Sequence, residues 1–177
     1  MLSVGLLFAP ATVDAQSEVA TAVDLSLGIG RMHSSTPHIG DGTAPTLDLT
    51  VSRWRRGATR GNVVFGAGAS TQGGGTSESI CLPSASGGCI PRYPNFVSLS
   101  ALAGWQTLRG RFRVLAGPTL AYADEAALGL QGRVDLAAPL TQRWSLTLNA
   151  RGFALPSLQG ASYQLFSVGV GLRIVQR

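Results

Sequence analysis

The stretch that decides the fold is F-S-V-G-V-G-L-R-I, which runs from Phe166 to Ile174. Its large apolar side chains fall on every second residue, and serine, glycine and arginine fill the positions between them. Because successive side chains of a β-strand point to opposite faces, this segment predicts a strand with one apolar face and one face of small or charged groups.

The same two-residue period recurs along the rest of the chain and predicts seven more strands. They cover 19–31, 45–53, 63–70, 97–106, 112–122, 128–138 and 144–151. Each approaches the length that a tilted strand needs to cross a bilayer, and tight arginine-rich turns alternate with longer loops. The sequence therefore predicts an all-β fold, an eight-stranded antiparallel up-and-down transmembrane β-barrel.

The chain resembles the bacterial outer-membrane β-barrel family, and in particular its small eight-stranded, OmpA-like class. The last strand of that family carries the pattern polar, any, Gly, any, any, hydrophobic, any, hydrophobic, which the barrel assembly machinery reads. The matching positions are Ser167, Gly169, Leu172 and Ile174, although the chain ends on Arg177 where the family usually has an aromatic residue. The resemblance implies a bacterial outer-membrane location, with the assembly machinery and outer-membrane lipids as partners.

The composition favours a membrane barrel over a nucleic-acid-binding domain. Only 13% of the residues are charged, which is about half the usual fraction for a soluble domain. The net charge is +5, but the arginines fall mostly at predicted turns, with no basic helix and no aromatic surface that reads bases. The sequence thus predicts no nucleic-acid partner.

Residues 1–15 are interpreted as a signal peptide, which leaves residues 16–177 as the barrel domain. A short apolar run, Leu2 to Ala11, precedes the small residues around Ala15 that a signal peptidase reads, so Gln16 is the expected mature N-terminus. The apolar run is too short to span a bilayer as a helix.

Aromatic residues on the apolar faces predict two interfacial girdles. Trp105, Phe112 and Trp144 lie at the turn ends of their strands, whereas Tyr122 and Phe166 lie at the loop ends. A soluble lipocalin-like barrel has the same alternation with its apolar face turned inward. The second face here, mostly small residues with a few charges, suits a packed lumen better than a water-exposed exterior, which favours the membrane barrel.

Charged residues on the second face form a candidate lumen network. An eight-stranded barrel is just wide enough for side chains to fill it, so these groups are expected to pair and close the lumen. A gated ion path is the alternative, and nothing in the sequence marks a wide pore. The predicted network consists of Asp24, Asp48, Arg113, Arg133, Asp135, Arg151 and Arg173.

Cys81 and Cys89 lie in the long loop at 72–95, where an oxidising periplasm favours a disulfide between them. His33 and His38 lie in the loop at 32–44, beside serines and Asp41. A catalytic or metal-binding use of these histidines is the alternative to an ordinary polar loop, which we favour because the spacing matches no known motif. The sequence thus predicts no catalytic residues, no metal site and no cofactor.

The sequence predicts a non-enzymatic, integral outer-membrane protein with a filled lumen. Its long extracellular loops are expected to serve a structural or surface-interaction role toward an unknown extracellular ligand. One alternative is a carrier or porin-like channel for small apolar molecules, built as a membrane barrel or as a lipocalin-like soluble barrel. The other is a lipid-modifying outer-membrane enzyme.

Overall fold

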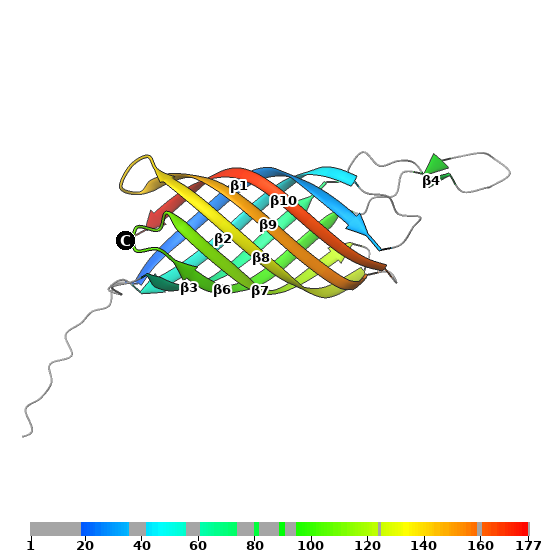
Figure 1. The fold of residues 1–177 in the computed structure, drawn as a ribbon, viewed down its shortest axis with the longest axis horizontal. Helices are drawn as coiled ribbons and strands as arrows, with labels where there is room; N and C mark the ends of the chain where they lie inside the picture. Colours follow the sequence, from blue (N-terminus) through cyan, green and yellow to red (C-terminus); the bar gives the residue numbers. More distant parts are fainter. Residues whose placement is uncertain are drawn as a thin grey trace, which may run out of the picture.

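The computed structural model describes residues 19–35, 42–55, 61–73, 80–81, 89–90, 95–123, 125–158 and 161–176. The signal peptide expected at 1–15 lies outside these residues. Eight long strands form one closed antiparallel barrel, which confirms the predicted fold class (Figure 1). They are β1 (Val19–Ser34), β2 (Gly42–Arg55), β3 (Asn62–Gln72), β6 (Phe96–Gln106), β7 (Phe112–Ala123), β8 (Glu125–Pro139), β9 (Trp144–Leu158) and β10 (Ala161–Gln176).

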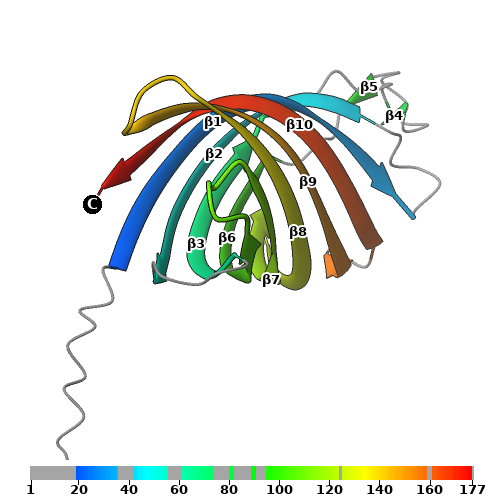
Figure 2. The same ribbon diagram turned by 60° about the vertical axis from the view of Figure 1, so that its left-hand side comes forward.

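Each long strand pairs with the next long strand in the sequence, and β10 returns to pair with β1. This closing ladder runs from Thr21 opposite Gln176 to Ser34 opposite Tyr163. Two short strands, β4 (Ile80–Cys81) and β5 (Cys89–Ile90), form a separate two-stranded sheet. In Figure 2 the strands β10, β9 and β8 follow one another around the wall.

The strands are longer than the period-two segments predicted, and most of the extra length lies at the loop end. Strand β9 continues to Leu158 instead of ending at Arg151, and β10 begins at Ala161 instead of Phe166. Within the described residues, no helix is long and apolar enough to span a membrane.

Side chains alternate between the lumen and the outer face, as the sequence pattern predicted. In β1, Asp24 is 1% exposed and faces the lumen, whereas its neighbour Leu25 is 52% exposed and faces outward. Exposed aliphatic side chains come from all eight barrel strands, and Leu130 on β8 is 69% exposed. The outside of the barrel is therefore an apolar belt, and the inside holds the charges.

The two ends of the barrel differ in their connections. The turns between β6 and β7 and between β8 and β9 lie at the end that also carries the C-terminus, whereas β4 lies beyond the opposite end (Figure 1). In the β8–β9 turn the Thr141 hydroxyl accepts hydrogen bonds from the amides of Arg143 and Trp144 at 3.2 and 3.1 Å. In the β6–β7 turn Gly110 has a φ of 63°, a left-handed conformation that favours glycine. These ends are called the turn end and the loop end below.

Candidate functional site

The most organised polar arrangement is an ionic cluster inside the lumen. Asp135 accepts hydrogen bonds from Arg113 Nε at 2.7 Å, Arg133 Nε at 2.6 Å and Arg173 Nη2 at 3.0 Å. Asp24 accepts from Arg113 Nη2 at 2.7 Å and from Arg173 Nε at 2.6 Å. Three arginines and two aspartates from four strands thus form one connected cluster.

This cluster bridges opposite walls of the barrel. In the closed strand order, β1 and β7 lie four positions apart, and so do β2 and β8. Arg113 on β7 reaches Asp24 on β1, and Arg133 Nη1 on β8 donates to Thr50 Oγ1 on β2 at 2.8 Å. Since these contacts cross the whole lumen, the cluster closes it as well as joining neighbouring strands.

Arg151 and Asp48 form a second ion pair in the lumen. Arg151 Nε also donates to Ser167 Oγ at 3.3 Å, and its guanidinium lies 5.8 Å from the ring centroid of Phe153. The structure therefore brings all seven predicted lumen charges into ion pairs, divided between a five-residue cluster and this separate pair.

The lumen charges do not balance, because three aspartates face four arginines there. Some buried polar atoms also have no hydrogen-bond partner within the described residues. They include Arg133 Nη2, Asn149 Nδ2, Ser26 Oγ and Thr147 Oγ1. Such groups are the ones that ordered water or a small anion usually satisfies in a buried polar space.

An apolar cluster closes the loop-end half of the lumen, beyond the segments for which the sequence predicted mostly small residues with a few charges. Phe96 packs edge-to-face on Phe153 and Tyr163, with centroid distances of 6.5 and 5.7 Å. We call this group the aromatic cluster; its buried members are Met32, Phe96, Ala121, Ala127, Phe153, Leu155, Tyr163 and Leu165. The sequence contains a signal for the β9 and β10 members of this cluster. If the two-residue period is continued beyond Arg151 on β9, and extended backwards from Ser167 on β10, it places them on the lumen face.

Neither a protein-family model nor a curated protein matches the sequence. Among solved structures, the chain is similar to Neisserial surface protein A (NspA), with a TM-score of 0.57 and 13% identity over 88% of this chain and 97% of that one. It is also similar to Ail, the attachment invasion locus protein of Yersinia pestis, with a TM-score of 0.49 and 11% identity over 86% and 98% of the two chains.

The likeness to NspA identifies the fold. The chain has the fold of the small eight-stranded outer-membrane barrels. In this eight-stranded barrel, the described connections at the turn end are short and the lumen is filled by side chains. At this level of identity the likeness extends to the fold alone.

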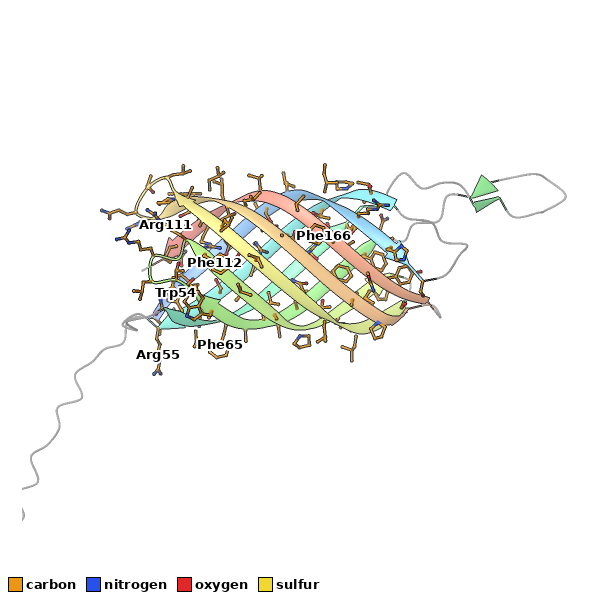
Figure 3. All side chains as sticks on the ribbon, in the orientation of Figure 1. Trp54, Arg55, Phe65, Arg111, Phe112 and Phe166 are labelled. Atoms are coloured by element: carbon orange, nitrogen blue, oxygen red, sulfur yellow. The ribbon has the colours of Figure 1, made fainter. Side chains whose placement is uncertain are left out.

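The predicted interfacial aromatics all lie on the outer face of this eight-stranded barrel. Their exposed fractions run from 36% for Phe112 to 59% for Phe166. Figure 3 shows Phe112 at the turn end, where Trp54, Arg55 and Arg111 also gather. Trp54 differs from the others because it packs inward, against Val64, Leu102 and Leu115. The five outward aromatics are Trp105, Phe112, Tyr122, Trp144 and Phe166.

The four residues of the predicted assembly signal divide between the two faces of β10. Ser167 and Gly169 face the lumen, whereas Leu172 is 43% exposed on the outer face and Ile174 is half-buried. Gly169 lies opposite Gly28 of β1, and a Cβ there would come within 2.8 Å of the Leu27 carbonyl oxygen. The glycine thus permits the close approach that closes the barrel.

His33 was expected in a loop, but it lies in β1, opposite Gln164 of β10. The strand extends because β10 begins five residues earlier than predicted and gives β1 a longer partner. His38 and Asp41 lie outside the described residues, so their proposed neighbourhood to His33 stays untested. Among the residues that the structure describes, no group of three or more histidine, cysteine, aspartate or glutamate side chains is placed to hold a metal ion.

Cys81 and Cys89 lie opposite each other in the β4–β5 ladder. Directly opposite residues of an antiparallel pair have Cα atoms about 4.5 to 5.5 Å apart, a range that a disulfide also uses. The backbone register is therefore compatible with the predicted disulfide, which stays a prediction.

Proposed function

We propose that this protein is an integral protein of the bacterial outer membrane, with a closed lumen and a structural or surface-interaction role at its loop end. The observation that carries the proposal is the reversal of polarity across the barrel wall. Leu25, Leu130 and Val170 are more than half exposed on the outside, while the ionic cluster is buried inside.

A soluble barrel needs the opposite arrangement. Exposing a continuous aliphatic belt to water would create an apolar patch far larger than the few hundred Å² that soluble monomers carry. The hydrocarbon core of a bilayer instead makes this belt the favoured surface, with Trp105, Phe112, Tyr122 and Trp144 near the strand ends at its borders. Phe166 lies farther from the loop end than predicted, because β10 begins at Ala161. This comparison supports the membrane barrel over the lipocalin-like alternative.

The turn end supplies a second line of support. Exposed arginines gather there beyond the apolar belt, and anionic lipid headgroups are their natural partners at a membrane surface. They also keep the border of the belt hydrated. In the described residues these are Arg53, Arg55, Arg109, Arg111 and Arg143.

The loop end is the part of the molecule that we assign to surface interactions. The β4–β5 pair forms a sheet separate from that of the barrel, and Figure 1 shows β4 beyond the loop end. Because long loops on a rigid barrel are where binding residues usually lie, the extracellular ligand is expected there. The proposal assigns no reaction to the chain, and it includes the assembly machinery as the partner that reads β10.

Cell fractionation with gel electrophoresis tests the membrane location. We expect the protein in the outer-membrane fraction, with an unboiled band that migrates differently from the boiled one. For orientation, Asn95→Cys and Gln142→Cys provide a matched pair in a background where Cys81 and Cys89 are replaced by serine. An impermeant thiol reagent should label Asn95→Cys on intact cells and spare Gln142→Cys. A soluble protein, or labelling of Gln142→Cys alone, would contradict the proposal.

A further inference from the structure

The ladder between β8 and β9 stops before either strand ends. Its last pair at the loop end is Leu130 opposite Ala154, whereas β8 begins at Glu125 and β9 ends at Leu158. Both strands stay paired with their other neighbours. Strand β8 pairs with β7 as far as Glu125, and β9 pairs with β10 as far as Leu158. The β7–β8 and β9–β10 hairpins therefore part from each other at the loop end, and we call this place the seam.

Local sequence explains why pairing ends there. Pro156 lies in β9 just past the last pair, and proline has no N–H to donate to a neighbouring strand. At the same level the register of β9 and β10 shifts between Ala161 and Tyr163. The proline and the register shift lie next to each other in the β9–β10 hairpin. They make its edge irregular, so the pairing of β9 with β8 does not continue beyond Ala154.

Two adjoining cavities follow the seam down the outer wall. Their volumes are about 480 and 650 Å³, and they share Leu130, Ala154 and Gln164 in their linings. The smaller cavity lies beside Pro156, above the last β8–β9 pair, and the larger one lies below it toward Phe166. Together they form one trough on the face that the apolar belt covers.

The floor of the trough is a gap in the belt. Gly132 of β8 and Gly152 of β9 lie opposite each other on the outer face. A Cβ on Gly132 would meet no atom within 4 Å, and a Cβ on Gly152 would meet only the Leu165 carbonyl oxygen, at 3.7 Å. Large side chains border this gap, with Leu130 and Phe166 at 69% and 59% exposed.

Both cavities reach the buried interior, and the larger one also has a charged border. Arg31 and His33 line the larger cavity from β1, and the Arg31 position lies opposite Phe166 of β10. The smaller cavity is lined in part by Leu155 and Tyr163, which are buried members of the aromatic cluster. Phe153 and Leu165 of the same cluster line the larger cavity, so an apolar ligand along the trough would contact buried residues throughout, with the Arg31 guanidinium beside it.

We propose that the trough is a binding site for one acyl chain of an anionic membrane lipid, with the headgroup at Arg31. The inference rests on the membrane location proposed above, because it requires lipid around the belt. The trough is an open, largely apolar depression in the lipid-facing wall, and an acyl chain lying in it gains fixed contacts with its floor and borders that it lacks in the fluid bilayer. On β1 the outward aliphatic residues end at Ile29, and Arg31 is the next outward position, so its positive charge lies where the belt of that strand ends and selects an anionic headgroup over a zwitterionic one.

Native mass spectrometry of the full chain released from lipid nanodiscs tests this proposal. The nanodiscs contain equal amounts of phosphatidylglycerol and phosphatidylcholine. We expect one retained lipid per protein, with phosphatidylglycerol preferred about fivefold, which is the effect of one basic residue at a membrane surface. Gly132→Leu or Gly152→Leu fills the trough and should abolish retention, whereas Arg31→Gln should retain a lipid without the preference.

Ala67→Leu is the matched control, because Ala67 faces outward on β3, four positions from β9 around the barrel. It adds the same bulk to the belt away from the seam and should retain the lipid. Release of the unmodified protein without lipid, or equal retention by Ala67→Leu and both glycine variants, would overturn the proposal. Retained selectivity in Arg31→Gln would overturn the headgroup assignment. Heat-modifiable migration checks insertion in each case, so a protein that never enters the nanodisc refutes the membrane location itself.

Discussion

Arg113 of β7 and Asp135 of β8 lie directly opposite each other, and Arg113 Nη2 lies 2.5 Å from Asp135 Oδ2. The same guanidinium reaches Asp24 on the far wall at 2.7 Å. One arginine therefore binds a carboxylate on a neighbouring strand and another on the opposite wall. It helps to fix the register of β7 and β8, and it also spans the lumen.

Removal of Asp135 should destabilise the barrel strongly. The Asp135→Ala variant leaves Arg133 without its carboxylate and takes one of two from Arg113 and Arg173. Loss of one partner from a buried ionic group costs about 3–5 kcal/mol of unfolding free energy. Urea unfolding in lipid vesicles, followed by tryptophan fluorescence, measures it. Ser98→Ala is the control, because it removes only a neutral hydrogen bond to Ser70 and should cost about 1 kcal/mol. Equal losses in the two variants would contradict a shared ionic cluster.

An arginine in the apolar belt should be costly in proportion to its depth. Val170 is 54% exposed in the middle part of β10, so Val170→Arg is expected to lower the unfolding free energy by about 2–4 kcal/mol. Val19 is equally exposed but begins β1 at the turn end, and Val19→Arg should cost about 0–1 kcal/mol. Vesicle unfolding compares the two, and a Val170→Arg barrel as stable as the Val19→Arg barrel would mean that the belt does not face lipid.

Two glycines should respond in opposite ways to alanine. A Cβ on Gly104 would lie 1.9 Å from the Val114 carbonyl oxygen and 2.9 Å from the Leu115 Cα, so β6 and β7 must shift apart. Such overpacking costs about 1–3 kcal/mol. Gly132→Ala meets open space and should be neutral or stabilise by about 0.4–1 kcal/mol, because alanine restricts the unfolded chain. The unfolding midpoints of the two variants test this difference. A destabilised Gly132→Ala barrel would mean that Gly132 does not face open space.

The opposed register of Cys81 and Cys89 predicts a disulfide in the exported protein. A bridge across so small a loop is worth about 2–3 kcal/mol to the loop in the chain-entropy model. Because β4 and β5 do not pair with the barrel strands, reduction should leave the unfolding of the barrel unchanged. Alkylation before and after reduction, read by mass spectrometry, is the measurement. Thiols that react without reduction would refute the disulfide.

The sequence predicts the barrel well because its signal is local. A two-residue period needs no knowledge of distant contacts, so it finds all eight strands and assigns Asp135 and Arg113 to the lumen face. It also predicts that Leu130 and Val170 face outward. Pairing partners across the lumen do not follow from that period, since the contact of Arg113 with Asp24 depends on how the sheet closes.

The sequence analysis missed two features of the structure. The aromatic cluster was missed because the predicted strands end too early, and the seam was missed because it depends on where β8 and β9 stop pairing. Phe153 and Tyr163 keep the parity of Arg151 and Ser167, so a longer segment would have placed them inside. The seam depends on the relative register of two hairpins. Pro156 was the only local sign of it, because a proline in a central strand argues against continued pairing.

The unmodified protein should form no large, steady conductance in planar bilayers. Two layers close its lumen: the ionic cluster, which crosses between opposite walls, and the aromatic cluster at the loop end. Since Phe96, Phe153 and Tyr163 pack together independently of the charges, Asp135→Ala should lose stability yet stay closed. A reconstituted porin is the positive control for channel detection. Steady channels from the unmodified protein would refute the filled lumen and favour the channel alternative, whereas channels from Asp135→Ala alone would show that the ionic cluster is the only barrier.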